Sequence, residues 1–279
     1  MARYPKIPLN DALVAITGAG RGIGLATAER FVAVGARVAL GDLDGPLAKE
    51  AADRLGSRAS GHDLDVTDKE SFAAFLAAAA EHHSAPLDVL VNNAGVMPNG
   101  AFLEQDDRVD RLTMDVNVYG LIHGMRLALP GMVERGRGHL VNVCSLAGKF
   151  PIKGLAMYNA SKFAAVGLTA AVRLELESTG VSVTAVLPSA VRTELSSGID
   201  YGLLPAVDPG EVSDAIVKSV RSRAAEIAVP AYVGVAAATV PLVPEALVRI
   251  IRHAAHDDAA ITRIDDAVRR RYLERILKQ

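Results

Sequence analysis

Short apolar runs alternate with longer, alanine-rich segments of helical pattern along most of this chain. Most of the runs are apolar at successive positions rather than at alternate ones, which is typical of strands buried on both faces of a parallel sheet. We predict strands at Leu13–Thr17, Arg37–Gly41, Val89–Asn92, Leu140–Val143, Val181–Leu187 and Ile227–Val229, and helices at Ile23–Val34, Glu70–Glu81, Asp110–Arg135, Met157–Ser178 and Pro209–Arg223. This order of elements predicts a doubly wound parallel α/β sheet.

The alternation ends near residue 230, and neither a repeat nor a low-complexity linker divides the sequence. We therefore predict a single α/β domain over residues 1–230, followed by a helical C-terminal extension over residues 231–279. The extension ends in a charged helix, predicted at Ala259–Lys278, with apolar side chains at roughly helical spacing. We expect these side chains to form a docking face: Ile261, Ile264, Val268, Tyr272 and Ile276.

The composition excludes several classes of protein. Lysine and arginine total 30 against 32 aspartate and glutamate, a net charge of −2, whereas nucleic-acid-binding proteins normally show a basic excess. Cys144 is the single cysteine of the sequence, so an internal disulfide framework and a multi-cysteine metal site are both excluded. We expect Cys144 to be a small buried hydrophobic residue, and we predict no metal and no nucleic-acid partner.

The N-terminal residues MARYPKIPLN lack the apolar core and cleavage site of a secretory signal, so we expect a cytoplasmic protein. Residues 227–244 carry no charge, and their number is at the lower limit for a membrane-spanning helix. This stretch contains Pro230, Pro241 and Pro244 and is rich in alanine and glycine. We predict a buried or substrate-covering segment and no membrane span, with contact at a membrane surface as the alternative.

A pair of histidines and a run of three arginines are expected to be solvated side chains rather than binding sites. His82 and His83 lie near the end of a predicted helix, and we expect both to be solvated. The run Arg269-Arg270-Arg271 shares its helix with several carboxylates, so we predict a solvated helix face rather than a nucleic-acid patch.

A glycine-rich turn follows the first predicted strand and leads directly into a helix: Thr17-Gly18-Ala19-Gly20-Arg21-Gly22-Ile23-Gly24. Glycines allow a tight turn and let backbone N–H groups approach a diphosphate at the positive end of the helix. The spacing of Gly18, Gly22 and Gly24 differs from the GxGxxG fingerprint of longer dinucleotide-binding proteins. The turn alone therefore indicates a nucleotide site less specifically than that fingerprint does.

Two charged residues bear on the choice of dinucleotide. Asp42 ends the second predicted strand, where a carboxylate can accept hydrogen bonds from an adenosine ribose and repel a 2′-phosphate. Arg21, inside the glycine turn, has the opposite effect, because a cation there could bind a 2′-phosphate. Asp42 thus favours NAD, whereas Arg21 favours NADP.

Three polar residues form a candidate catalytic group. Ser145 follows the apolar strand Leu140–Val143, at the carboxyl end where ligands bind in sheets of this kind. Tyr158 and Lys162 lie four positions apart, which places both side chains on one face of a helix. We expect the ammonium to lower the pKa of the phenol, and a phenol tuned in this way can act as a general acid or base.

With these motifs in place, the chain resembles the short-chain dehydrogenase/reductase family, of the compact type. The resemblance runs from Thr17 to about Pro230 and implies a Rossmann-type, three-layer αβα domain. The segments that carry it are Thr17–Gly24, Asp65-Val66, Asn92-Asn93-Ala94-Gly95, Asn117 to Gly120, Asn142-Val143-Cys144-Ser145 and Tyr158-Asn159-Ala160-Ser161-Lys162.

This resemblance implies catalytic roles for four residues. Tyr158 would donate or accept the proton, and Ser145 would hold the substrate oxygen. Lys162 would bind the nicotinamide ribose and tune Tyr158, while Asn117 would support a water relay to Lys162. The implied reaction is hydride transfer between an alcohol carbon and the nicotinamide ring.

The resemblance also implies contacts with the cofactor. Asp65 and Val66 would bracket the adenine, Asn93 would lie beside the adenosine ribose, and Thr193 would contact the nicotinamide carboxamide. Asp42 matches the acid that selects NAD in this family, so we predict NAD, with NADP less favoured. The remaining expected cofactor-binding residues are Ala94, Gly95, Pro188, Ser189 and Val191, where Ser189 replaces the usual glycine.

The substrate is less constrained by the sequence. The segments after Ser145 and Thr193 are mostly apolar, which favours an apolar secondary alcohol or ketone. We expect Leu146, Phe150, Ile152, Leu155, Met157, Leu195, Ile199, Tyr201, Leu203 and Leu204 to line the substrate pocket. We also expect residues 231–279 to pack on or cover this side.

The sequence leaves two other functions as alternatives. One is an NADPH-dependent ketoreductase that acts on acyl-chain 3-oxo substrates. The other is a cofactor-sensing binding protein on the same fold, which the complete set of catalytic residues disfavours. The resemblance further implies a homodimer or homotetramer formed through the two long helices.

Overall fold

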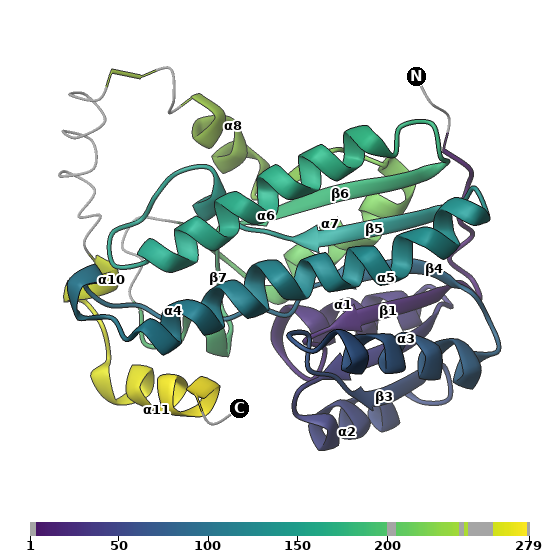
Figure 1. Ribbon diagram of the computed structural model, residues 1–279, viewed down its shortest axis with the longest axis horizontal. Helices are drawn as coiled ribbons and strands as arrows, with labels where there is room; N and C mark the ends of the chain where they lie inside the picture. Colours follow the sequence, from purple (N-terminus) through teal and green to yellow (C-terminus); the bar gives the residue numbers. More distant parts are fainter. Residues whose placement is uncertain (1–3, 200–204, 240–242, 245–258, 278–279) are drawn as a thin grey trace.

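The computed structural model describes residues 4–199, 205–239, 243–244 and 259–277 (Figure 1). A seven-stranded parallel sheet with the order β3-β2-β1-β4-β5-β6-β9 forms its centre. The strands are β1 (Leu13–Thr17), β2 (Arg37–Asp42), β3 (Ala59–Asp63), β4 (Leu87–Asn92), β5 (Gly138–Val143), β6 (Val181–Pro188) and β9 (Glu226–Val229). The predicted doubly wound, three-layer architecture is therefore confirmed.

Helices cover both faces of the sheet (Figure 1). One layer packs its apolar side chains against one face, and consists of α1 (Gly22–Ala33), α2 (Gly45–Leu55) and α7 (Pro209–Ser222). The other layer packs against the opposite face, and consists of α3 (Lys69–His83), α5 (Gly120–Glu134) and α6 (Ala156–Glu175). The strands between these layers are almost entirely buried, which explains why they are apolar at successive positions.

The sequence-based prediction omitted helix α2 and the strand β3 that follows it, and it made strand β4 too short. The edge strand β3 reads ASGHD and pairs only with β2, so it lacks the apolar run that marks a central strand. Strand β4 begins at Leu87 rather than at the predicted Val89 because Asp88 is buried within it. The Asp88 carboxylate accepts hydrogen bonds from Leu13 N at 3.3 Å and from the Arg137 side chain at 2.9 Å.

The long helix predicted at Asp110–Arg135 is divided in the structure. It consists of α4 (Asp107–Met114), a π-helical turn η2 (Asp115–Tyr119) and α5, which follow one another directly. A π-helical turn inside an α-helix often marks a functional position, because the extra residue redirects nearby side chains. Asn117 lies within this turn.

The described part of the C-terminal segment contains the helices α8 (Ala231–Thr239), α10 (Ala259–Thr262) and α11 (Asp266–Leu277). The single helix predicted at Ala259–Lys278 is wrong, because residues 263–265 interrupt it. Ile264 forms an antiparallel bridge with Ile199, and Asp265 Oδ1 accepts the N–H groups of Ala267 and Val268, both at 3.1 Å, at the start of α11. Of the expected docking face, Tyr272 and Ile276 are buried, whereas Ile261 is exposed.

The uncharged stretch 227–244 begins in β9 and continues into α8. Val233 and Ala237 of α8 are buried against the sheet, whereas Tyr232 and Val235 are exposed. Within the part of the chain that the structure describes, no helix is both long and apolar enough to cross a membrane.

Two expectations about solvated side chains are wrong. His83 is buried, and its Nε2 lies 3.0 Å from Ser60 Oγ. Arg269 is only 3% exposed, because α11 turns it toward the carbonyl groups of neighbouring loops, whereas Arg270 and Arg271 are exposed as expected. The sequence pattern could not distinguish these positions, since the burial of each depends on a segment that is distant in sequence.

Candidate active site

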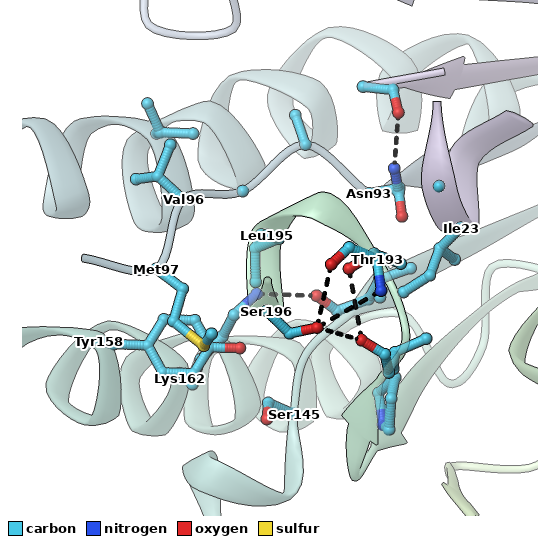
Figure 2. Close-up of a pocket in the computed structure, with 18 of the residues that line it drawn as sticks. Ile23, Asn93, Val96, Met97, Ser145, Tyr158, Lys162, Thr193, Leu195 and Ser196 are labelled. Carbon is cyan, nitrogen blue, oxygen red and sulfur yellow. Dashed lines mark hydrogen bonds between the residues drawn. The ribbon is translucent and has the colours of Figure 1, made fainter. Parts of the chain in front are cut away.

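A cavity of about 600 Å³ opens at the carboxyl ends of the parallel strands. The turn after β1, the loops after β4 and β5, the start of α6 and the segment after β6 all contribute to its wall. Figure 2 shows Tyr158, Lys162, Ser145 and Thr193 around this space. The structure thus brings the predicted serine, tyrosine and lysine to a single cavity.

Tyr158 and Lys162 are one turn apart on α6, and both are buried. Lys162 Nζ donates a hydrogen bond to the Val143 carbonyl at 3.1 Å and lies 5.7 Å from the centroid of the Tyr158 ring. Ser145 begins the short 3-10 helix η3 (Leu146–Gly148) and accepts the Ala147 N–H at 3.1 Å. The hydroxyl, phenol and ammonium groups are therefore held in place by the protein itself.

The expected lowering of the Tyr158 pKa is not found. Burial raises the pKa of Tyr158 to about 12, and a hydrogen bond from Ser145 opposes this rise. Burial also lowers the pKa of the Lys162 ammonium. Desolvation of the phenol outweighs the hydrogen bond with Ser145, so Tyr158 carries its proton at neutral pH and can donate it.

Asn117 lies outside the main cavity, on a small hollow of about 10 Å³ that Lys162 also lines. Its Oδ1 accepts the Val96 N–H at 2.9 Å, and its Nδ2 donates to the Val96 carbonyl at 2.9 Å and to Ser161 Oγ at 3.0 Å. A Cβ on Gly95 would lie 3.2 Å from Asn117 Oδ1 and 3.7 Å from Lys162 Nζ. This hollow has about the volume that one water molecule needs, roughly 10–15 Å³.

The glycine turn fits the phosphates of a dinucleotide. Helices α2, α3, α4 and α7 each begin directly after an aspartate that caps their first turn. Helix α1, in contrast, has neither a side-chain cap nor an acidic residue in its first turn, and Gly22 and Ile23 line the cavity there. A Cβ on Gly22 would lie 3.4 Å from Thr193 Cγ2 and would narrow this space. The first-turn N–H groups of α1 therefore remain free for an anionic group.

Three of the expected cofactor-binding residues lie away from the main cavity and shape the turn instead. The Thr17 hydroxyl accepts the N–H groups of Asn93 and Ala94, both at 3.0 Å. Gly24 packs directly against the backbone of Gly18, where a Cβ would lie 2.2 Å from the carbonyl oxygen. The Gly20 N–H donates to Asp42 Oδ2 at 2.8 Å.

Asp42 and Arg21 both line the cavity but have different partners. The second oxygen of Asp42 accepts the Asp44 N–H at 3.1 Å, which leaves other lone pairs of this carboxylate available. The Arg21 guanidinium donates to Asp44 at 3.2 Å and to Glu194 at 2.7 Å. Arg21 is therefore paired with two carboxylates, a feature that the sequence did not reveal.

The remaining expected cofactor residues line the cavity: Gly18, Asp65, Val66, Asn93, Ala94, Gly95, Pro188, Ser189, Val191 and Thr193. Ser189 takes the place of a glycine without strain, because its φ is not positive. Its hydroxyl donates to the Pro205 carbonyl at 2.7 Å, and Ala190–Val191 (β7) pairs with Ala206–Val207 (β8). The loop thereby keeps Thr193 at the cavity.

The model of the short chain dehydrogenase family matches residues 12–202. The chain belongs to this family. It is 34% identical over 247 residues to the probable oxidoreductase EphD of Mycobacterium tuberculosis, covering 78% of this chain and 41% of that protein. The chain thus spans less than half the length of these mycobacterial relatives. It is also 32% identical over 215 residues to an uncharacterized oxidoreductase of Staphylococcus saprophyticus, covering 76% of this chain and 92% of that protein.

Solved structures of family members have the same fold. A 3-ketoacyl-(acyl-carrier-protein) reductase from Brucella melitensis, complexed with NADH, matches with a TM-score of 0.74 and 27% identity, over 79% of this chain and 97% of that one. A short chain dehydrogenase/reductase from Burkholderia phymatum, in complex with NAD, matches with a TM-score of 0.73 and 25% identity, over 80% of this chain and 90% of that one. Together with the family match, these similarities establish that the chain has the fold of the short chain dehydrogenase family.

Five of the ten residues expected to line the substrate pocket are found at this cavity. Leu146, Phe150, Ile152, Leu155 and Leu195 line the cavity. Met157 is partly buried elsewhere, and Ile199 belongs to the same apolar cluster as Tyr158 without lining the cavity. Tyr201, Leu203 and Leu204 lie outside the described residues.

The sequence missed several cavity residues. Met97 follows the Asn92–Gly95 motif, and Val233, Tyr272, Arg275 and Ile276 come from the C-terminal segment. Helical spacing marked Tyr272 and Ile276 as docking residues, but nothing in the sequence indicated which surface they would reach. Among the described residues, the structure contains no group of three or more side chains that could hold a metal ion.

Proposed function

We propose that this oxidoreductase transfers a hydride between NAD(H) and an apolar secondary alcohol or ketone, with Tyr158 as the general acid and base. The observation that carries the proposal is the single cavity shared by Ser145, Tyr158, Lys162 and the uncapped start of α1. A bound nicotinamide would supply the hydride donor or acceptor, chemistry that side chains do not perform.

The protein residues would orient the substrate and move one proton. The Ser145 hydroxyl would hydrogen-bond to the reacting oxygen of the substrate. Tyr158 would give its proton to that oxygen in ketone reduction and take it back in alcohol oxidation. Since burial keeps the pKa of Tyr158 high, at about 12, the phenol is protonated and ready for the reductive direction.

Lys162 and Asn117 would restore that proton. Lys162 lines both the main cavity and the small hollow beside Asn117. A water in this hollow would have Asn117 and Lys162 as polar partners, which is the arrangement expected for the relay. Asn117 is thus proposed as a residue that positions the water.

NAD is proposed over NADP because of how Asp42 and Arg21 are placed. The Asp42 carboxylate lines the cavity with lone pairs available for ribose hydroxyls. A 2′-phosphate would meet this negative charge and would have to compete with Asp44 and Glu194 for Arg21. The complexes of the Brucella and Burkholderia proteins with NADH and NAD are consistent with this choice.

An apolar substrate is proposed because the cavity wall beyond Tyr158 is mainly apolar, with Leu146, Phe150, Ile152, Leu195 and Val233. We further propose that residues 231–279 cover this side, since α8 and α11 supply part of the wall. A second candidate function is reduction of 3-oxoacyl chains with NADPH, which the similarity to the Brucella 3-ketoacyl reductase favours.

A homodimer or homotetramer is also proposed, formed through the two long helices. Tyr119, directly before α5, is 53% exposed, and Phe163 of α6 is 44% exposed, so both offer apolar surface for pairing. Light scattering coupled to size exclusion would test this, with a monomer as the contradicting result.

The function is tested with a panel of apolar secondary alcohols and NAD, followed by the absorbance of NADH. We expect turnover of several medium-chain alcohols with NAD and much slower turnover with NADP. Turnover of 3-oxoacyl thioesters with NADPH, without turnover of the alcohols with NAD, would favour the second candidate and contradict the first.

A further inference from the structure

Tyr272 is a second tyrosine on the wall of the reaction cavity. It comes from α11, outside residues 12–202 that match the family model, so the family match says nothing about its role. Its side chain is 5% exposed and lines the same cavity as Ser145 and Tyr158.

The Tyr272 hydroxyl has an unused proton. Its oxygen accepts the Met97 N–H at 2.8 Å. A phenol oxygen can accept one hydrogen bond and still donate its own proton to another group. Within the described part of the chain, Met97 is the partner of this hydroxyl, and it supplies a donor rather than an acceptor. Because burial raises the pKa of Tyr272, the hydroxyl keeps its proton and remains a donor.

The ring that carries this hydroxyl is held rigidly. The guanidinium carbons of Arg269 and Arg275 lie 4.4 and 5.5 Å from the centroid of the Tyr272 ring. Arg269 is itself fixed by hydrogen bonds to Asn99 Oδ1 at 2.6 Å and to the Leu195 carbonyl at 3.0 Å. Arg275 pairs with Glu194. The position of the hydroxyl is therefore set before any ligand binds.

Tyr272 and Tyr158 line the same cavity. A charge on Tyr272 raises the pKa of Tyr158, so the two phenols interact electrostatically. Met97, which bonds to Tyr272, packs in one apolar cluster with Tyr158 and Leu155, and Figure 2 shows Met97 beside Tyr158. A ligand whose reacting oxygen reaches Tyr158 therefore lies close to the hydroxyl of Tyr272, which is already held in position.

We propose that Tyr272 is a specificity-determining residue that donates a hydrogen bond to a second oxygen of the substrate. This inference rests on the proposed function and narrows its substrate class. The preferred substrate is an apolar ketone or alcohol that carries a further neutral acceptor, such as an ether or carbonyl oxygen, near the reacting carbon. A plain aliphatic ketone would leave the buried Tyr272 O–H without a partner, which disfavours its binding.

The test uses 2-nonanone and a series of its analogues in which one ether oxygen replaces each inner methylene in turn. These ketones differ little in shape and carry no charge, so they isolate the effect of the added acceptor. We expect at least one analogue to show a kcat/KM about tenfold above that of 2-nonanone. In Tyr272→Phe this advantage should disappear, so that the kcat/KM values of 2-nonanone and of the best analogue lie within about threefold of each other.

The matched control is Tyr232→Phe, which removes the hydroxyl of a tyrosine on α8 that is 66% exposed. It should keep the advantage of the oxygenated ketone. The proposal is overturned if no analogue exceeds 2-nonanone in the unmodified protein, a result that needs no variant. It is also overturned if Tyr272→Phe slows all ketones equally. A lack of turnover with every ketone and NADH contradicts the proposed function itself, and the present inference with it.

Discussion

Replacement of Asp42 should change which dinucleotide the protein prefers. The proposed variant is Asp42→Asn, which keeps the size of the side chain and one carbonyl oxygen that can accept the Gly20 N–H. The charge is lost, and with it the repulsion of a 2′-phosphate. Arg21 remains paired with Asp44 and Glu194 in the variant, so the change isolates the effect of the Asp42 carboxylate.

The size of this effect follows from the charges involved. A 2′-phosphate carries about −1.5 to −2 charges near neutral pH. At about 4 Å, two unit charges repel by about 1 kcal/mol in water and by about 4 kcal/mol near a protein surface. Asp42 is partly exposed, and we therefore take about 3 kcal/mol for the whole interaction, which corresponds to about a hundredfold in the ratio of affinities.

The dissociation constants of NADH and NADPH are measured by fluorescence titration for the unmodified protein and for Asp42→Asn. The control is Asp53→Asn, which removes the same charge from an exposed position on α2 outside the cavity. We expect Asp42→Asn to shift the preference toward NADPH by about a hundredfold and Asp53→Asn to leave it unchanged. The reasoning is refuted if the unmodified protein already binds NADPH more tightly, or if both variants behave alike.

Three further predictions concern the relay, the C-terminal helix and the core. Gly95→Ala places a methyl between Asn117 and Lys162 and should lower turnover about tenfold, whereas Gly167→Ala, which meets no atom within 4 Å, should leave turnover unchanged. Arg269→Met removes the donor to the Asn99 side chain and to the Leu195 and Met97 carbonyls and should cost about 3 kcal/mol of stability, against almost nothing for the exposed Arg270→Met, as measured by urea unfolding. Burial lowers the pKa of His139 to about 3 from its ordinary value of 6.5. Between these two pH values, His139 binds a proton in the unfolded chain but not in the folded one. Stability should therefore fall as the pH drops below 6.5, by about 2 kcal/mol at pH 5, and His139→Gln should reduce this fall. Equal urea midpoints for the two arginine variants, or a pH dependence that His139→Gln leaves intact, would contradict these expectations.

The sequence predicted the central strands well because their burial is continuous. Strand β1 has the predicted bounds, and every residue in it is buried. Strand β3 was missed because an edge strand needs few apolar residues, and its histidine and aspartate obscure the pattern. Ser145, Tyr158 and Lys162 could be predicted because they lie close together in sequence, within one strand–loop–helix unit.

Contacts between distant segments could not be predicted in the same way. Tyr272 binds the backbone of a residue that is 175 positions away, and Arg21 pairs with Glu194, which is 173 positions away. Helical spacing showed that α11 has a buried face but could not show that this face completes the cavity. The raised pKa of Tyr158 likewise depends on burial by the surrounding fold rather than on its spacing from Lys162.

The central claim is that Tyr158 moves the proton of a hydride-transfer reaction. Its most direct test is Tyr158→Phe, assayed both for NADH binding and for turnover of the best alcohol or ketone of the panel, with Tyr119→Phe at an exposed position as the control. We predict that Tyr158→Phe binds NADH as the unmodified protein does but loses turnover by about a hundredfold or more, while Tyr119→Phe retains both. Retention of turnover by Tyr158→Phe, with NADH binding intact, would contradict the claim.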